Sequence, residues 1–222
     1  MNARSLIRWA GAAAMAAGII FAVIQPIHPP DELASVATSA WTIITAAKTA
    51  MCLLFLLGFA GLYARQVEKA GWLGLAGFLL LICSWWLQTA FVFAEAFILP
   101  PLASEAPEFV DSFLGTIAAG RASAVDLGAL PMLYNLGVGI PYMLGGLLFG
   151  IATFRAGVLP RWAGGLLAAS GPLAMVMVAL LPHQLERLAA IPMGLAVAWL
   201  GYALWAERRE RVVEPALRAA SS

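Results

Sequence analysis

The chain has 222 residues, of which 62% are hydrophobic and only 11% are charged, and its formal net charge is +1. An ordinary soluble domain carries roughly 25% charged residues, so this composition indicates a protein whose surroundings are mostly lipid. Nucleic-acid binding is excluded, because no basic run with interleaved aromatic residues occurs.

Apolar runs long enough to cross a bilayer recur along nearly the whole chain, which predicts one all-α transmembrane domain over residues 1–222. We expect a bundle of six membrane-spanning helices at residues 6–26, 37–64, 71–99, 132–156, 161–181 and 187–206. The apolar part of the first run is followed by no small-residue cleavage site, so we expect it to stay in place rather than serve as a signal peptide. A polar tail over 208–222 is expected to fray.

The long polar stretch at 102–130 follows Pro100 and Pro101, which we expect to end the third helix. Inside this stretch, apolar residues recur at helical spacing opposite polar ones; the apolar set is Phe109, Val110, Phe113, Leu114 and Ile117. This pattern predicts an amphipathic helix between the third and fourth spans, lying on the membrane surface or capping the bundle. Glycines and a proline at the start of the fourth span, Gly137, Gly139 and Pro141, indicate a kink there.

Basic residues near the predicted helix ends set the expected orientation. Ten of the thirteen fall on one side of a six-helix topology: Arg4, Arg8, Arg65, Lys69, Arg155, Arg161, Arg208, Arg209, Arg211 and Arg218. The positive-inside rule therefore predicts that the N- and C-termini are both cytoplasmic and that residues 102–130 are external. The first span also carries a run of alanines and Gly18, and the fourth carries Gly146 and Gly150, both of which favour close helix packing.

Lys48 lies inside the second predicted span, where an isolated charge costs a few kcal/mol and therefore indicates a site. Counting about 1.5 Å per residue from the cytoplasmic helix ends places Lys48, Gln25 and Gln88 at a depth of roughly 25 Å. Asn135 falls slightly further out, and Glu95 falls roughly 10 Å above Lys48. These five residues predict an outward-facing polar pocket, with Glu95 as the counter-ion that Lys48 snorkels outward to reach. The alternative is that Lys48 simply snorkels to the external interface.

His28 and His183 each follow a proline closely at an external helix end. With Glu95 or Asp31 they offer two histidines and a carboxylate, a ligand set that metals accept. No local motif such as His-Glu-x-x-His is present, so we predict no metal and no other cofactor, and we keep the two histidines only as candidates.

Residues 154–164 read Phe-Arg-Ala-Gly-Val-Leu-Pro-Arg-Trp-Ala-Gly, and residues 61–65 read Gly-Leu-Tyr-Ala-Arg. These loop motifs resemble those of a broad group of uncharacterised six-helix bacterial integral membrane proteins of about this length. The resemblance implies a bacterial cytoplasmic (inner) membrane location, and it transfers no active-site residue, because none is established for that group.

Three classes of function stay open at this point. We favour a protein that binds or carries a small-molecule or lipid-like ligand in the pocket around Lys48 without catalysis. The second class is an accessory or structural subunit that associates with a membrane-protein partner or with further copies of itself. The third is a metal-dependent intramembrane hydrolase that uses His28, His183 and a carboxylate.

Overall fold

The computed structural model describes residues 3–117, 123–180 and 183–220; the side chains of residues 3–4, 178–179, 183–184 and 207–220 lie outside this description. Within these ranges every regular element is helical, so the all-α class is confirmed there. In chain order the elements are α1 (Ala3–Ile27), α2 (Leu33–Val36), α3 (Ser39–Phe93), η1 (Ala94–Ile98), α4 (Leu99–Glu105), α5 (Pro107–Ile117), α6 (Leu130–Met132), η2 (Leu133–Gly139), α7 (Ile140–Ala156), α8 (Arg161–Leu180), η3 (His183–Ala190) and α9 (Ile191–Ala220).

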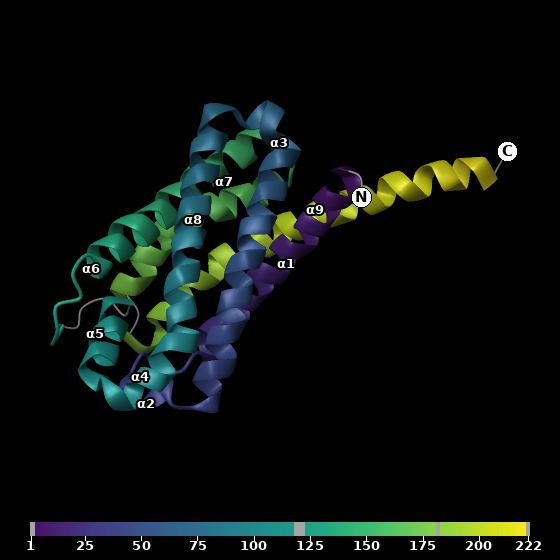
Figure 1. Cartoon of the computed structure of the whole chain (residues 1–222). Helices are drawn as coiled ribbons and strands as arrows, with labels where there is room; N and C mark the ends of the chain where they lie inside the picture. The colour runs from purple at the N-terminus through teal and green to yellow at the C-terminus, as the bar shows by residue number, and fades with distance from the viewer. Residues whose placement is uncertain (1–2, 118–122, 181–182, 221–222) are drawn as a thin grey trace.

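The long helix α3 is a hairpin of two antiparallel arms that reverses at Gly71, as Figure 1 shows at the top of the molecule. Gly71 has φ 57° and ψ −164°, a conformation that is open essentially only to glycine. Aromatic pairs join the arms at matching distances from the turn, because the Phe55 and Trp85 rings stack at 3.9 Å and those of Tyr63 and Phe78 at 4.6 Å. We call Ser39–Ala70 the first arm and Trp72–Phe93 the second arm.

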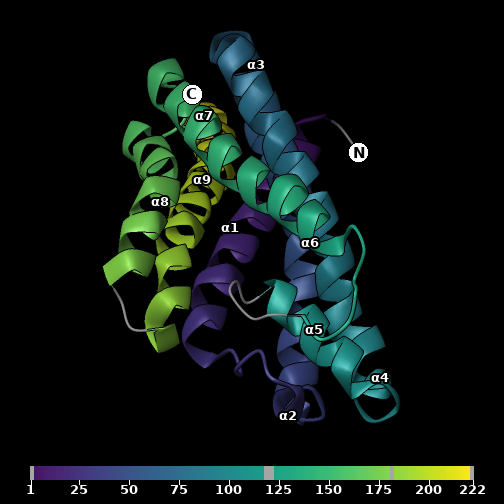
Figure 2. The same cartoon turned by 90° about the vertical axis from the view of Figure 1, so that its left-hand side faces the viewer.

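The helices follow one another around a closed bundle (Figure 2). Helix α1 packs between α9 and α3, α7 packs between α3 and α8, and α8 closes the circle against α9. The short helices α2, α4 and α5 gather at the end of the bundle opposite the Gly71 turn, whereas α9 continues well beyond the bundle (Figure 1).

Small residues let α1 and α9 approach closely. Gly18 lies against Gly194, and Gly11 lies against Gly201, so the two glycine pairs are seven residues apart on both antiparallel helices. A Cβ atom added to Gly18 would lie 2.4 Å from the Gly194 carbonyl oxygen. Such backbone-to-backbone packing is how helices associate in lipid, where burial of apolar surface between helices gives little driving force.

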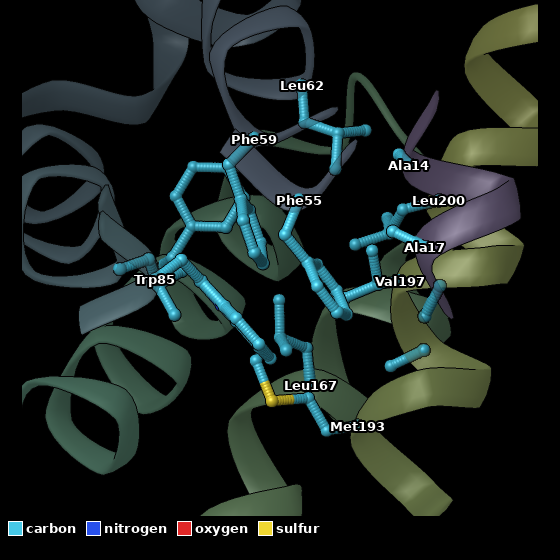
Figure 3. Packing of buried hydrophobic residues seen from close by; sticks show 14 of the residues in the cluster. Ala14, Ala17, Phe55, Phe59, Leu62, Trp85, Leu167, Met193, Val197 and Leu200 are labelled. Carbon is cyan, nitrogen blue, oxygen red and sulfur yellow. The ribbon is translucent and has the colours of Figure 1, made fainter. Parts of the chain in front are cut away.

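The core between α1, the two arms of α3 and α9 is aromatic at its centre (Figure 3). Phe21 meets both rings of the stacked Phe55–Trp85 pair edge-on, at 5.6 and 5.5 Å. A second apolar cluster lies at the end that carries α2, α4 and α5, and it consists of Val36, Trp41, Phe91, Leu99, Val110, Phe113, Leu114 and Val138. We call this second cluster the cap, because it closes that end of the bundle.

Two expected helix ends are wrong. The second predicted span does not end at residue 64, because residues 65–70 continue the first arm as far as the turn at Gly71. Pro100 and Pro101 do not stop the next span, because they occupy the first turn of α4, where the missing N–H groups are not needed. The five-residue π-helical segment η1 comes directly before α4.

The remaining segments agree with expectation in part. A helix of the expected amphipathic character, α5, lies within 102–130 and contributes to the cap. The irregularity expected around Gly137, Gly139 and Pro141 is the π-helical segment η2. Helix α9 continues at the backbone to Ala220. The expected fraying of the tail stays a prediction.

Four helical stretches within the described ranges are long and apolar enough to cross a membrane, which agrees with a membrane protein. They are Ser5–Ile24, Ser39–Glu105, Leu130–Ala156 and Leu185–Ala206. The second of them contains the hairpin, and the six-helix count and topology are not confirmed.

We predict that Gly18→Ala destabilises the bundle by about 1–3 kcal/mol, because the added methyl group has to push α1 and α9 apart. The measurement is thermal unfolding of the purified protein in detergent, followed by tryptophan fluorescence. Gly139→Ala is the control, because its added Cβ would have no neighbour closer than 4.0 Å. Equal melting temperatures for the two variants would contradict the close α1–α9 contact.

Candidate functional site

A buried ion pair joins the first arm of the α3 hairpin to η1, which continues the second arm. The Lys48 Nζ atom, on the first arm, lies 2.5 Å from Glu95 Oε2, on η1. The side chains are only 12% and 1% exposed, so the pair is almost completely shielded. The expected pairing of these two residues is therefore present in the structure.

The expected height difference between the two residues is wrong, and the position of the turn explains the error. The sequence-based count for Lys48 began at Arg65, whereas the first arm continues to Gly71. Counted from Gly71, Lys48 lies 23 residues before the turn and Glu95 lies 24 residues after it. At about 1.5 Å per residue on both antiparallel arms the two side chains are level, so the lysine does not have to snorkel outward.

His28, just beyond α1, is the third member of the site. Its Nε2 atom lies 3.2 Å from Lys48 Nζ, and its Nδ1 atom lies 2.6 Å from the carbonyl oxygen of Pro29. A carbonyl oxygen only accepts and an ammonium group only donates, so His28 is neutral with its proton on Nδ1. Lys48 therefore donates to both His28 and Glu95. We call Lys48, Glu95 and His28 the polar cluster.

Burial, together with the positive charges of Lys48 and Arg187, lowers the pKa of His28 to about 3. Burial disfavours the charged imidazolium, and a neighbouring ammonium group disfavours it further. The neutral form inferred from the hydrogen bonds is therefore also the form that the electrostatics favour at pH 7.

Trp41 holds the backbone of the site in place. Its indole Nε1–H donates to the carbonyl oxygen of Glu95 over 2.9 Å, and its ring meets that of His28 edge-on at 5.7 Å. Glu95 lies in the π-helical segment η1, and π-helical turns are frequent at functional sites. Trp41 is fully buried, so its one polar atom needs this acceptor.

One atom of the site has no partner. Glu95 Oε1 is buried and has no hydrogen-bond partner, whereas Oε2 is bound to Lys48. An unpaired buried acceptor is costly, and in a native protein it requires an explanation. The site therefore offers one free acceptor next to an ammonium group that has a third N–H bond to donate.

An ion pair and the cap surround the polar cluster. Arg187 of η3 binds Asp31, which lies in the connection between α1 and α2. Trp41 connects the cap to the polar cluster, because its ring packs in the cap and its indole N–H donates to the Glu95 carbonyl oxygen. The polar cluster thus lies where the bundle meets the short helices at this end, with His28 half-buried.

The other predicted pocket residues lie differently. Gln25 is half-buried and donates to the carbonyl oxygen of Phe21 in its own helix, and Gln88 is also half-buried. Asn135 is exposed and donates to the carbonyl oxygen of Pro131, within its own helical segment. The structure therefore brings together Lys48 and Glu95, but its contacts do not join the three amide residues to them.

The metal candidates gain no support from the described geometry. Within the described residues, no group of three His, Cys, Asp or Glu side chains is placed to hold a metal ion. His28 directs Nε2 at the Lys48 ammonium group, a position unsuited to a cation. His183 begins η3, and its side chain lies outside the described residues.

Sequence reasoning missed two features. His28 was considered only as a metal candidate, although an Nδ1–carbonyl contact at a helix end leaves Nε2 free to accept from a lysine. A second buried polar pair lies elsewhere in the bundle, where Gln66 Nε2 donates to Thr153 Oγ1 over 2.8 Å. Gln66 was not predicted as a buried residue, because the expected helix ended at residue 64 and Gln66 was therefore assigned to a loop.

No family model, curated protein or solved structure matches this chain. The resemblance of residues 154–164 to six-helix bacterial membrane proteins therefore stays a prediction, and the site must be interpreted from its own chemistry.

We predict that Lys48→Met destabilises the protein by about 3–5 kcal/mol, because it leaves the Glu95 carboxylate buried without a counter-ion. The double variant Lys48→Met/Glu95→Gln removes both charges and should recover most of this loss. Denaturant unfolding in detergent is measured for Lys48→Met, for Glu95→Gln and for the double variant. A double variant as unstable as the sum of the two single variants would show that the ion pair is not coupled.

The lowered pKa of His28 predicts a pH dependence of stability. The unfolded chain binds a proton near pH 6.5 and the folded chain only near pH 3, so the unfolding free energy should fall as the pH drops between these values. Above about pH 6.5, His28 should have no effect. Unfolding measured from pH 7.5 to 4.5 should show a smaller loss for His28→Gln than for wild type; equal losses would contradict a neutral, buried His28.

Proposed function

We propose that this protein binds or carries a small or lipid-like ligand at the polar cluster, without catalysis, in the inner membrane of a bacterium. The ligand would engage Lys48 and Glu95, the two predicted site residues that lie in contact. Gln25 and Gln88 are proposed as outer neighbours that reach the ligand only through a change of rotamer, and Asn135 needs the largest movement because it is exposed.

We further propose six membrane crossings, with both termini cytoplasmic and the polar cluster near the external ends of the spans. The two arms of α3 support this count, because each is long enough to cross by itself. In this proposal the side with the Gly71 turn is cytoplasmic, because basic residues gather there. Arg65 and Lys69 precede the turn, and Arg155 and Arg161 lie on either side of the α7–α8 connection.

The proposal of a ligand at the polar cluster rests on Glu95 Oε1, which is buried and has no hydrogen-bond partner. A buried ion pair adds little net stability to a fold, so stability alone does not account for this pair. Next to the free acceptor, the third N–H bond of Lys48 is a donor. A hydroxyl or amide group that donates to Glu95 and accepts from Lys48 would satisfy both, and the apolar surroundings favour a ligand with an apolar body.

The experiment is native mass spectrometry of the protein extracted in a mild detergent, with chemical identification of co-purified molecules. Wild type should carry a ligand of defined mass, and Lys48→Met/Glu95→Gln should lose it, because both the acceptor and the donor are changed. Asn135→Ala is the control, because it removes a polar side chain that lies outside the polar cluster.

The outcome separates the ligand-binding protein from the accessory subunit. Wild type that carries no small molecule but retains a second protein would favour the subunit and overturn the ligand proposal. A ligand that stays bound to the double variant would show that it binds elsewhere.

A further inference from the structure

Two hollows lie side by side next to the Gly71 turn. The first, of about 240 Å³, lies between the start of the second arm and the end of α7, and it is lined by Lys69, Ala70, Gly71, Trp72, Leu73, Ala152 and Arg155. The second, of about 270 Å³, lies against the α7–α8 connection, and it is lined by Arg65, Gln66, Glu68, Lys69, Gly157 and Val158. Lys69 lines both of them.

The first hollow combines cations with an apolar wall. Lys69 and Arg155 supply the positive charge, whereas Trp72 and Leu73 supply the apolar surface. Trp72 is 85% exposed, which is typical of an indole at the boundary between headgroups and acyl chains. A phosphate group with an attached acyl chain fits this combination, because basic pockets between membrane helices bind lipid headgroups.

Gln66 lines the second hollow, and its acceptor atom is buried. Gln66 is 1% exposed, its Nε2 atom donates to Thr153, and its Oε1 atom has no hydrogen-bond partner. A turn of the Gln66 side chain toward the hollow would let a hydroxyl group donate to this acceptor, which a phosphate oxygen cannot do. Glu68, the one acidic residue among those that line the two hollows, is exposed.

We propose that the two hollows form one binding site for an anionic phospholipid with a hydroxylated headgroup, of the phosphatidylglycerol type. Its phosphate binds between Lys69 and Arg155, its headgroup hydroxyl donates to Gln66, and an acyl chain follows Trp72 and Leu73 into the membrane. This site is separate from the polar cluster and does not depend on the ligand proposed there.

The test places wild-type protein in nanodiscs of phosphatidylcholine containing graded amounts of phosphatidylglycerol and measures the melting temperature and the retained lipid by native mass spectrometry. Wild type should be stabilised by phosphatidylglycerol and should retain one molecule of it. Lys69→Gln/Arg155→Gln should bind it about thirtyfold more weakly, because each cation near the surface contributes close to a fivefold effect.

Arg8→Gln is the matched control. It removes the same charge from the same end of the bundle, because Ala10 of α1 lies against Gly61 of the first arm. Arg8 itself lies over the Trp205 ring and lines neither hollow. Arg155→Gln should weaken phosphatidylglycerol binding more than Arg8→Gln does; equal effects would show diffuse surface attraction and overturn the site. Glycerol 3-phosphate is the soluble probe, and stabilisation by it equal to that by the lipid would overturn the assignment to a phospholipid.

Gln66→Leu tests the headgroup hydroxyl. This variant should lose the preference for phosphatidylglycerol over phosphatidic acid, which lacks the glycerol hydroxyl groups, while it keeps its affinity for phosphatidic acid. An unchanged preference would show that Gln66 does not bind the headgroup.

Discussion

The ion pair between Lys48 and Glu95 is the constraint on which this end of the molecule depends. A carboxylate with 1% exposure in an apolar bundle needs a counter-charge, and Lys48 supplies it from the opposite arm of a hairpin. The two residues meet because the turn at Gly71 is almost midway between them in the sequence. His28 and Trp41 then complete the site, the first by accepting from Lys48 and the second by binding the backbone of Glu95.

Small residues make this arrangement possible, because they fix how closely the helices pack. Gly58 and Gly61 of the first arm lie against Ala14 and Ala10 of α1, in the same way that Gly18 lies against Gly194 of α9. With so little side-chain volume at these interfaces, the backbones of neighbouring helices touch. The rigid frame that results holds His28, at the end of α1, against Lys48 on the first arm.

The two ends of the α3 hairpin have different chemistry. At the open end the charges are buried and bound to one another, with Glu95 Oε1 left as a free acceptor. At the Gly71 turn the cations lie around hollows that open to the surface beside the exposed Trp72. A buried ion pair with one free acceptor suits a selective ligand, whereas an exposed basic hollow suits the lipid headgroups that surround the protein.

The sequence by itself determined the helical class, the apolar character of the helices, the amphipathic helix in the 102–130 segment and the pairing of Lys48 with Glu95, because hydrophobicity and isolated charge are properties of local composition. It misplaced Glu95 by roughly 10 Å, because polar residues 65–70 suggest a loop although they extend a helix. No local sequence pattern determines how each helix is rotated about its axis. The sequence therefore predicted Asn135 as a neighbour of Lys48, whereas the structure shows the Asn135 side chain exposed. Only the tertiary structure decided which side chains meet, because the glycine contacts set the separation and rotation of the helices, and the turn at Gly71 set their register.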